Sequence, residues 1–68
     1  MTAKELNKIL ADHALWLENK GGKRADLRWA NLQSVDLRMA DLRGAILQGA
    51  NLRGVDLREA DLRLADLQ

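Results

Sequence analysis

Leucine recurs every five residues from Leu27 to Leu67, and this spacing excludes the two common regular structures. Five residues advance an α-helix by about 500°, so successive leucines would scatter around its axis. On a flat strand, an odd spacing sends alternate leucines to opposite faces. A chain that turns a corner after each unit keeps every leucine inside, and four units then close a square coil.

A square coil predicts a second period of twenty residues, and the repeat segment has one. Its only two valines, Val35 and Val55, lie twenty residues apart, as do its only two asparagines, Asn31 and Asn51. Thirteen of the first twenty repeat positions are identical in the second twenty. We therefore expect successive coils to stack directly on one another with parallel backbone pairing.

The residues before the repeats predict one amphipathic helix from Thr2 to about Lys20. Thr2 and Glu5 have the spacing of a capping box, in which each side chain pairs with the backbone of the other residue. The glycines at 21 and 22 are expected to end the helix in a left-handed conformation. The face expected to pack over the first coil is formed by Leu6, Leu10, His13 and Leu17.

The repeated A(D/N)LXX motif resembles the pentapeptide-repeat family. Nine units carry it through 25–68, and Ile46 is the one residue that departs from Asp or Asn at the second position. The resemblance implies an all-β solenoid, a right-handed quadrilateral parallel β-helix of about two coils, capped by one N-terminal α-helix. We expect one structural domain, with the capping helix and Gly-Gly turn in 1–24 and the β-helix in 25–68.

The composition argues against an enzyme and against a bound cofactor or metal. The sequence has no cysteine and one histidine, so thiolate sites and histidine clusters cannot form. The carboxylates repeat identically along the coil, whereas an active site needs an asymmetric group of residues in a pocket. No apolar stretch is long enough to span a membrane. Glu5 and Asp12 lie where a signal peptide needs an apolar core, so we expect a cytoplasmic protein without a membrane partner.

The last coil is expected to be open, because no second capping element follows the repeats. We therefore predict a homodimer in which the C-terminal ends of two chains meet. The alternative is that the sequence is a piece of a longer solenoid. The residues predicted at the dimer end are Leu52, Leu57, Leu62, Leu64 and Leu67.

Outward-facing residues of the repeats form the candidate partner surface. Trp29 has two interpretations, an anchor for a partner or a residue that packs beneath the helix, and we favour packing. Apolar residues scattered on a surface are also common without a binding role. The candidate partner surface consists of Trp29, Met39, Ile46, Arg38 and Arg58.

Three functions are compatible with these features. The first is a scaffold that acts through contacts with an unidentified protein partner. The second is a small inhibitor of a nucleic-acid machine, either a phage-encoded inhibitor of a host defence complex or a gyrase inhibitor, since some pentapeptide-repeat proteins mimic duplex DNA. The third is weak direct binding of nucleic acid. The repeats carry six arginines against seven acidic residues, which weakens both the mimicry and the nucleic-acid interpretations.

Overall fold

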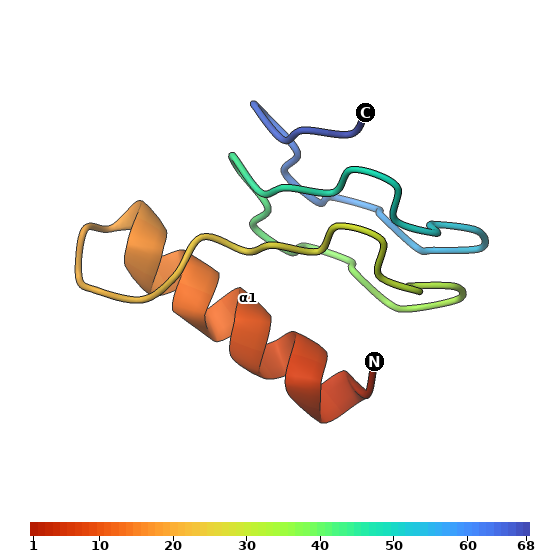
Figure 1. Ribbon diagram of the computed structural model, residues 1–68, viewed down its shortest axis with the longest axis horizontal. Coiled ribbons are helices and arrows are strands. Elements are labelled where there is room, and N and C mark those ends of the chain that lie inside the picture. Colours follow the sequence, from red (N-terminus) through yellow and green to blue (C-terminus); the bar gives the residue numbers. More distant parts are fainter.

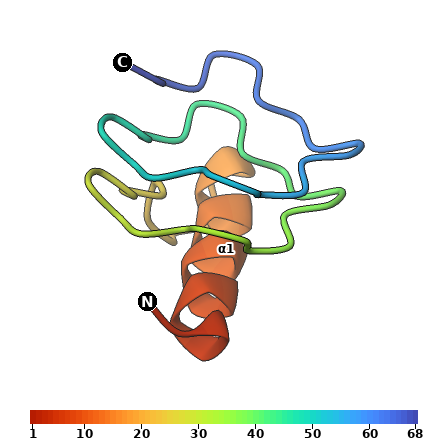
Figure 2. The ribbon, with the colours of Figure 1, turned by 90° about the vertical axis from the view of Figure 1, so that its right-hand side faces the viewer.

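The computed structural model describes all residues, 1–68, and contains one helix followed by a coiled repeat segment (Figure 1). Helix α1 spans Ala3–Leu17. The chain then reverses and rises away from α1 in stacked layers, which Figures 1 and 2 show from two sides. We call 25–44 the first layer and 45–64 the second layer; residues 65–68 begin a third. The C-terminus lies on the side opposite α1.

Both ends of α1 have a local cause in the sequence. The capping box is confirmed: the Thr2 N–H donates to Glu5 Oε1 at 3.0 Å, and the Glu5 N–H donates to Thr2 Oγ1 at 3.1 Å. The helix ends at Leu17, three residues before the expected Lys20, and Asn19 takes a left-handed conformation with φ 58°. The predicted left-handed glycines are confirmed, with φ 83° at Gly21 and φ 74° at Gly22, and a Cβ at Gly22 would collide with the Asp12 carbonyl oxygen.

The layers are joined by parallel bridges between residues twenty positions apart, so the predicted register is observed. The bridges are single, and no continuous strand forms, because each unit bends directly after its bridge. At one such bend the Ala30 N–H donates to the Leu27 carbonyl at 3.1 Å. The β character of the repeats is therefore present as isolated bridges: Asp26 to Ile46, Asn31 to Asn51, Asp36 to Asp56, Asp41 to Asp61 and Ile46 to Asp66.

Each bend is stabilised by the Asp or Asn of its own unit. In eight of the nine units, Oδ1 of this residue accepts a hydrogen bond of 3.0–3.3 Å from the N–H two positions later. Ile46 is the exception, because its side chain has no oxygen. The fifth residue of each unit then takes a positive φ, as at Trp29, Ser34, Met39, Gly44, Gly49, Gly54, Glu59 and Leu64.

The core lies between α1 and the two layers. The leucines of the first layer are 0–1% exposed, and Leu47 in the second layer is 2% exposed. Ala25 and Ala45 fill the narrow positions beside them, also 0–1% exposed. Each buried leucine contributes about 1.5–3 kcal/mol before conformational entropy is subtracted. The core side chains are thus most completely buried at the end of the repeats that the helix covers.

Candidate interaction surfaces

The helix covers the first layer mainly through its N-terminal half. Leu6 is 5% exposed and belongs to the buried core, and Ile9 and Leu10 pack against that core while partly exposed. Leu17 is half-buried and is not among the side chains that pack against the core. The apolar contact therefore weakens towards the C-terminal end of α1, where a polar contact takes its place.

That polar contact is made by His13, which is fully buried between α1 and the first layer. The Ala25 N–H donates to His13 Nδ1 at 2.9 Å, and Nε2 lies 2.8 Å from the Arg43 carbonyl oxygen. The sequence predicted packing for this residue but did not predict that both ring nitrogens bond the backbone. The single histidine on an apolar helix face was the available signal.

Trp16 and Arg24 cover the histidine from the solvent side. The rings of His13 and Trp16 stack with centroids 5.3 Å apart. The Arg24 guanidinium carbon lies 5.6 Å from the centre of the Trp16 ring, and Arg24 Nε donates to the Gly44 carbonyl oxygen. These contacts join the residues that follow α1 to the last bend of the first layer.

Trp29 does not pack beneath the helix, so the interpretation favoured from the sequence is wrong. Its side chain is 79% exposed, and its ring lies against Gly49 in the second layer. The reason is the left-handed backbone at this bend, φ 63°, which directs the side chain outward. The absence of a side chain at Gly49 then provides the space for the indole.

The other apolar candidates lie in different columns of the coil. Met39 is 72% exposed at a bend that adjoins Glu59, and Ile46 is half-buried between two bridges. Trp29 lies at a different bend from Met39, beside Gly49. The structure therefore does not bring these three apolar residues together into one patch.

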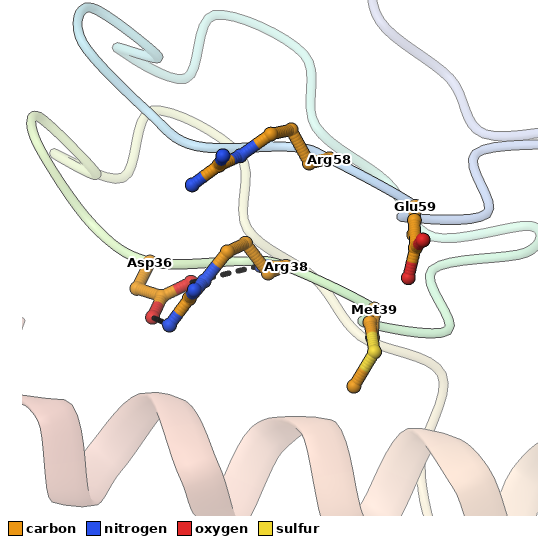
Figure 3. A pocket seen from close by; sticks show the side chains of 5 residues that line it. All are labelled: Asp36, Arg38, Met39, Arg58 and Glu59. Atoms are coloured by element: carbon orange, nitrogen blue, oxygen red, sulfur yellow. Dashed lines mark hydrogen bonds and ion pairs between the residues drawn. The ribbon is translucent and has the colours of Figure 1, made fainter.

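Arg38 and Arg58 line an open depression on one side of the coil, together with Asp36, Met39 and Glu59 (Figure 3). Arg38 holds Asp36 through two side-chain bonds of 3.0 and 2.9 Å. These bonds, together with the bond from the Arg38 backbone, lower the pKa of Asp36 to about 2. The depression is thus lined by arginines that are already neutralised.

The same pairing recurs along the coil. Wherever an Asp is followed two positions later by an Arg, the two side chains form an exposed ion pair with N···O distances of 2.7–2.9 Å. The partner arginine lowers the pKa of each of these carboxyls. Arg53 lacks such a partner, because residue 51 is Asn. Five of the seven acidic residues of the repeats are therefore compensated within their own units, and Glu59 and Asp66 are not.

The second layer ends in an uncovered edge. Leu52, Leu57 and Leu62 are only partly buried, whereas Leu64 is 92% exposed and Leu67 is 54% exposed. Backbone N–H groups along this edge have no backbone acceptor, and they belong to Leu52, Gly54, Leu57, Glu59, Leu62 and Leu64. The carbonyls of Ala50, Val55 and Ala60 accept no backbone hydrogen bond.

The remaining surface offers little else for a site. No group of three or more His, Cys, Asp or Glu side chains is placed to hold a metal ion. α1 lacks the length and the apolar character that crossing a bilayer requires, and it is the one helix of the structure.

Comparison with known proteins identifies the repeat. The family model "Pentapeptide repeats (8 copies)" matches residues 23–49. No curated protein and no solved structure matches the chain. The motif continues with the same bends and bridges beyond the matched residues, as far as Asp66. The matched segment of this chain therefore belongs to the pentapeptide-repeat family.

Proposed function

We propose that this chain is a non-enzymatic scaffold, folded as a right-handed quadrilateral β-helix of about two coils, that acts through protein–protein contacts. We further propose that two copies associate end to end through the second layer. The supporting observation is the difference in burial between the two ends. The first-layer leucines beneath α1 are 0–1% exposed, whereas Leu67 at the other end is 54% exposed.

The uncovered edge is suited to a twofold contact. Apolar side chains there would lose solvent exposure, at about 25 cal/mol for each Å² of apolar surface removed from water. Each copy also offers the three free carbonyls of Ala50, Val55 and Ala60 to amides of the other copy. Free amides outnumber these carbonyls, so apolar packing supplies most of the stabilisation in this proposal.

Light scattering coupled to size-exclusion chromatography tests the association. We expect about twice the 7.6 kDa chain mass at tens of micromolar protein. Leu67→Glu should give the monomer, because it places a charge in the apolar contact. Met39→Glu is the matched control, since Met39 is also exposed but lies in the first layer. A wild-type monomer, or equal loss of the dimer in both variants, contradicts the proposal.

Trp29 is the residue that we propose as the anchor for a protein partner. It is large, apolar and 79% exposed, and it occupies a left-handed conformation that glycine adopts without strain. A pull-down from the native host should recover a partner with the wild-type chain but not with Trp29→Gly. Recovery of the same partner with both chains would show that Trp29 does not contribute to the contact.

No observation favours the two nucleic-acid alternatives. A DNA mimic needs rows of free carboxylates, and a nucleic-acid binder needs free cations. In the repeats, five Asp–Arg pairs neutralise each other within the same unit, which leaves Arg53 and Asp66 as the one arginine and the one aspartate outside such pairs. A gyrase supercoiling assay and a gel shift at low salt should therefore both be negative.

A further inference from the structure

His13 joins the helix to the first layer through both nitrogens of its ring. Its side chain is fully buried, and the partners are the Ala25 N–H, 2.9 Å from Nδ1, and the Arg43 carbonyl, 2.8 Å from Nε2. These partners lie at opposite ends of the first layer, 25–44. One side chain thus holds the beginning and the end of that layer against α1.

The backbone partners determine where the imidazole proton lies. A backbone N–H can only donate, so Nδ1 must carry a lone pair to accept the bond from Ala25. A backbone carbonyl can only accept, so Nε2 must carry the hydrogen that is donated to Arg43. A neutral imidazole with its proton on Nε2 satisfies both partners, and no other state of the ring does.

We propose that protonation of His13 weakens the contact between α1 and the first layer, so that this helical cap responds to pH. A second proton on Nδ1 would point at the Ala25 N–H, which replaces a hydrogen bond with two opposed donors. It would also place a positive charge in a fully buried position.

The groups around the ring offer no compensation for that charge. Both ring nitrogens bond the backbone, so no carboxylate accepts a hydrogen bond from the ring. The Trp16 ring separates His13 from the Arg24 guanidinium, which is itself a cation. The charged residues on the elements around this contact are Lys4, Glu5, Lys8 and Asp12 of α1, Glu18, Lys20, Lys23 and Arg24 after it, and Asp26, Arg28, Asp36, Arg38, Asp41 and Arg43 of the first layer.

Few other side chains of this protein gain or lose a proton near the pH range in which histidine does. His13 is the only histidine and the chain has no cysteine. The arginine partners lower the pKa of the ion-paired aspartates, which keeps them ionised well below the range in which histidine titrates. The N-terminal amine and the unpaired carboxyls remain, and variants of His13 separate the contribution of the imidazole from theirs.

Trp16 reports on the ring because it stacks on it. In a Trp29→Phe background, Trp16 is the only tryptophan, so the tryptophan emission reports on its surroundings alone. We expect its emission to decrease and shift to longer wavelength as the pH falls from about 7.5 to about 5. Over the same range, the protection factor of the Ala25 amide should fall about tenfold. His13→Gln and His13→Asn in the same background cannot titrate and should show neither pH response.

Nitrogen NMR of the wild-type imidazole makes the test independent of the variants, which could be destabilised. While the contact with Ala25 and Arg43 is intact, the ring should be neutral with its proton on Nε2. A neutral ring with the proton on Nδ1 overturns the geometry on which the proposal rests. An imidazolium at about pH 5 with an unchanged Ala25 protection factor overturns the proposal itself, as does the same pH response in both His13 variants.

Discussion

The indole ring of Trp29 lies against the backbone of Gly49, the residue twenty positions later in the sequence. A methyl group at Gly49 would collide with the ring, and the backbone there has φ 67°. A large side chain in one layer thus requires the absence of a side chain in the next. This relationship links a surface residue to the register of the layers.

Gly49→Ala should therefore be more destabilising than an equivalent change at another bend. We expect a loss of about 1–3 kcal/mol in the free energy of unfolding, because strain at positive φ adds to the collision with Trp29. Gly54→Ala is the control, with nearly the same φ of 68° but a milder contact, because its Cβ would lie 3.3 Å from Ser34 Oγ, at the end of a small side chain. Urea unfolding followed by circular dichroism measures both. Equal losses would show that Trp29 does not occupy this space.

Thr2→Ala should remove the capping box of α1. The Glu5 N–H loses the acceptor that now lies 3.1 Å away, and N-cap replacement by alanine lowers stability by about 1 kcal/mol. Thr2→Ser keeps the hydroxyl and should be close to the wild type. Because α1 covers the core of the first layer, the loss should appear in the whole unfolding transition. If only the helical circular dichroism signal changed and the unfolding of the repeats did not, the helix and the repeats would not unfold cooperatively, which contradicts this prediction.

Asn51→Ala should destabilise its bend by removing the bond that its Oδ1 accepts from the Arg53 N–H at 3.1 Å. We expect a loss of about 1 kcal/mol in the free energy of unfolding. Asn51→Asp retains the acceptor and should keep most of the stability. If Asn51→Asp is as unstable as Asn51→Ala, the amide rather than the acceptor oxygen is required.

The sequence predicted the register and the capping box because both depend on local spacing. Asn31 and Asn51, twenty residues apart, form one of the observed bridges. The sequence analysis missed the role of the Asp and Asn side chains at the bends, because it interpreted the acidic residues only through their charge balance with arginine. Two residues carry the clue, since Asn31 and Asn51 fill the same position without a charge.

Other features could not be predicted because they depend on three-dimensional placement. The orientation of Trp29 follows from its left-handed backbone, which the sequence motif does not specify for a tryptophan. The bond between His13 and Arg43 joins residues thirty positions apart on different elements. The helix ends three residues before the expected position because Asn19 is already left-handed ahead of Gly21 and Gly22, and the sequence pattern does not specify this for an asparagine.

Acid should destabilise the repeats through the paired aspartates. Side-chain and backbone bonds from the arginine two positions later lower the pKa of Asp36 and of Asp61 to about 2. Because the folded pKa lies below the unfolded value of about 3.9, their contribution is complete above about pH 4 and is lost as the pH falls towards about 2. The urea midpoint should decrease across this interval in His13→Gln, which lacks the histidine titration. A midpoint that does not change down to about pH 2 would show that these bonds do not stabilise the fold.

The central claim is that the repeats stack with a register of twenty residues, and engineered cysteines test it directly. Ser34 and Gly54 are neighbours across the layers, with Ser34 Oγ 3.3 Å from the Cβ position of Gly54. The chain has no natural cysteine, so Ser34→Cys with Gly54→Cys should form an intramolecular disulfide under mild oxidation. Ser34→Cys with Glu59→Cys shifts the pair by one unit and should remain reduced. Mass spectrometry distinguishes the two: oxidation of the first pair alone is the predicted result, and preferential oxidation of the second pair would contradict the register.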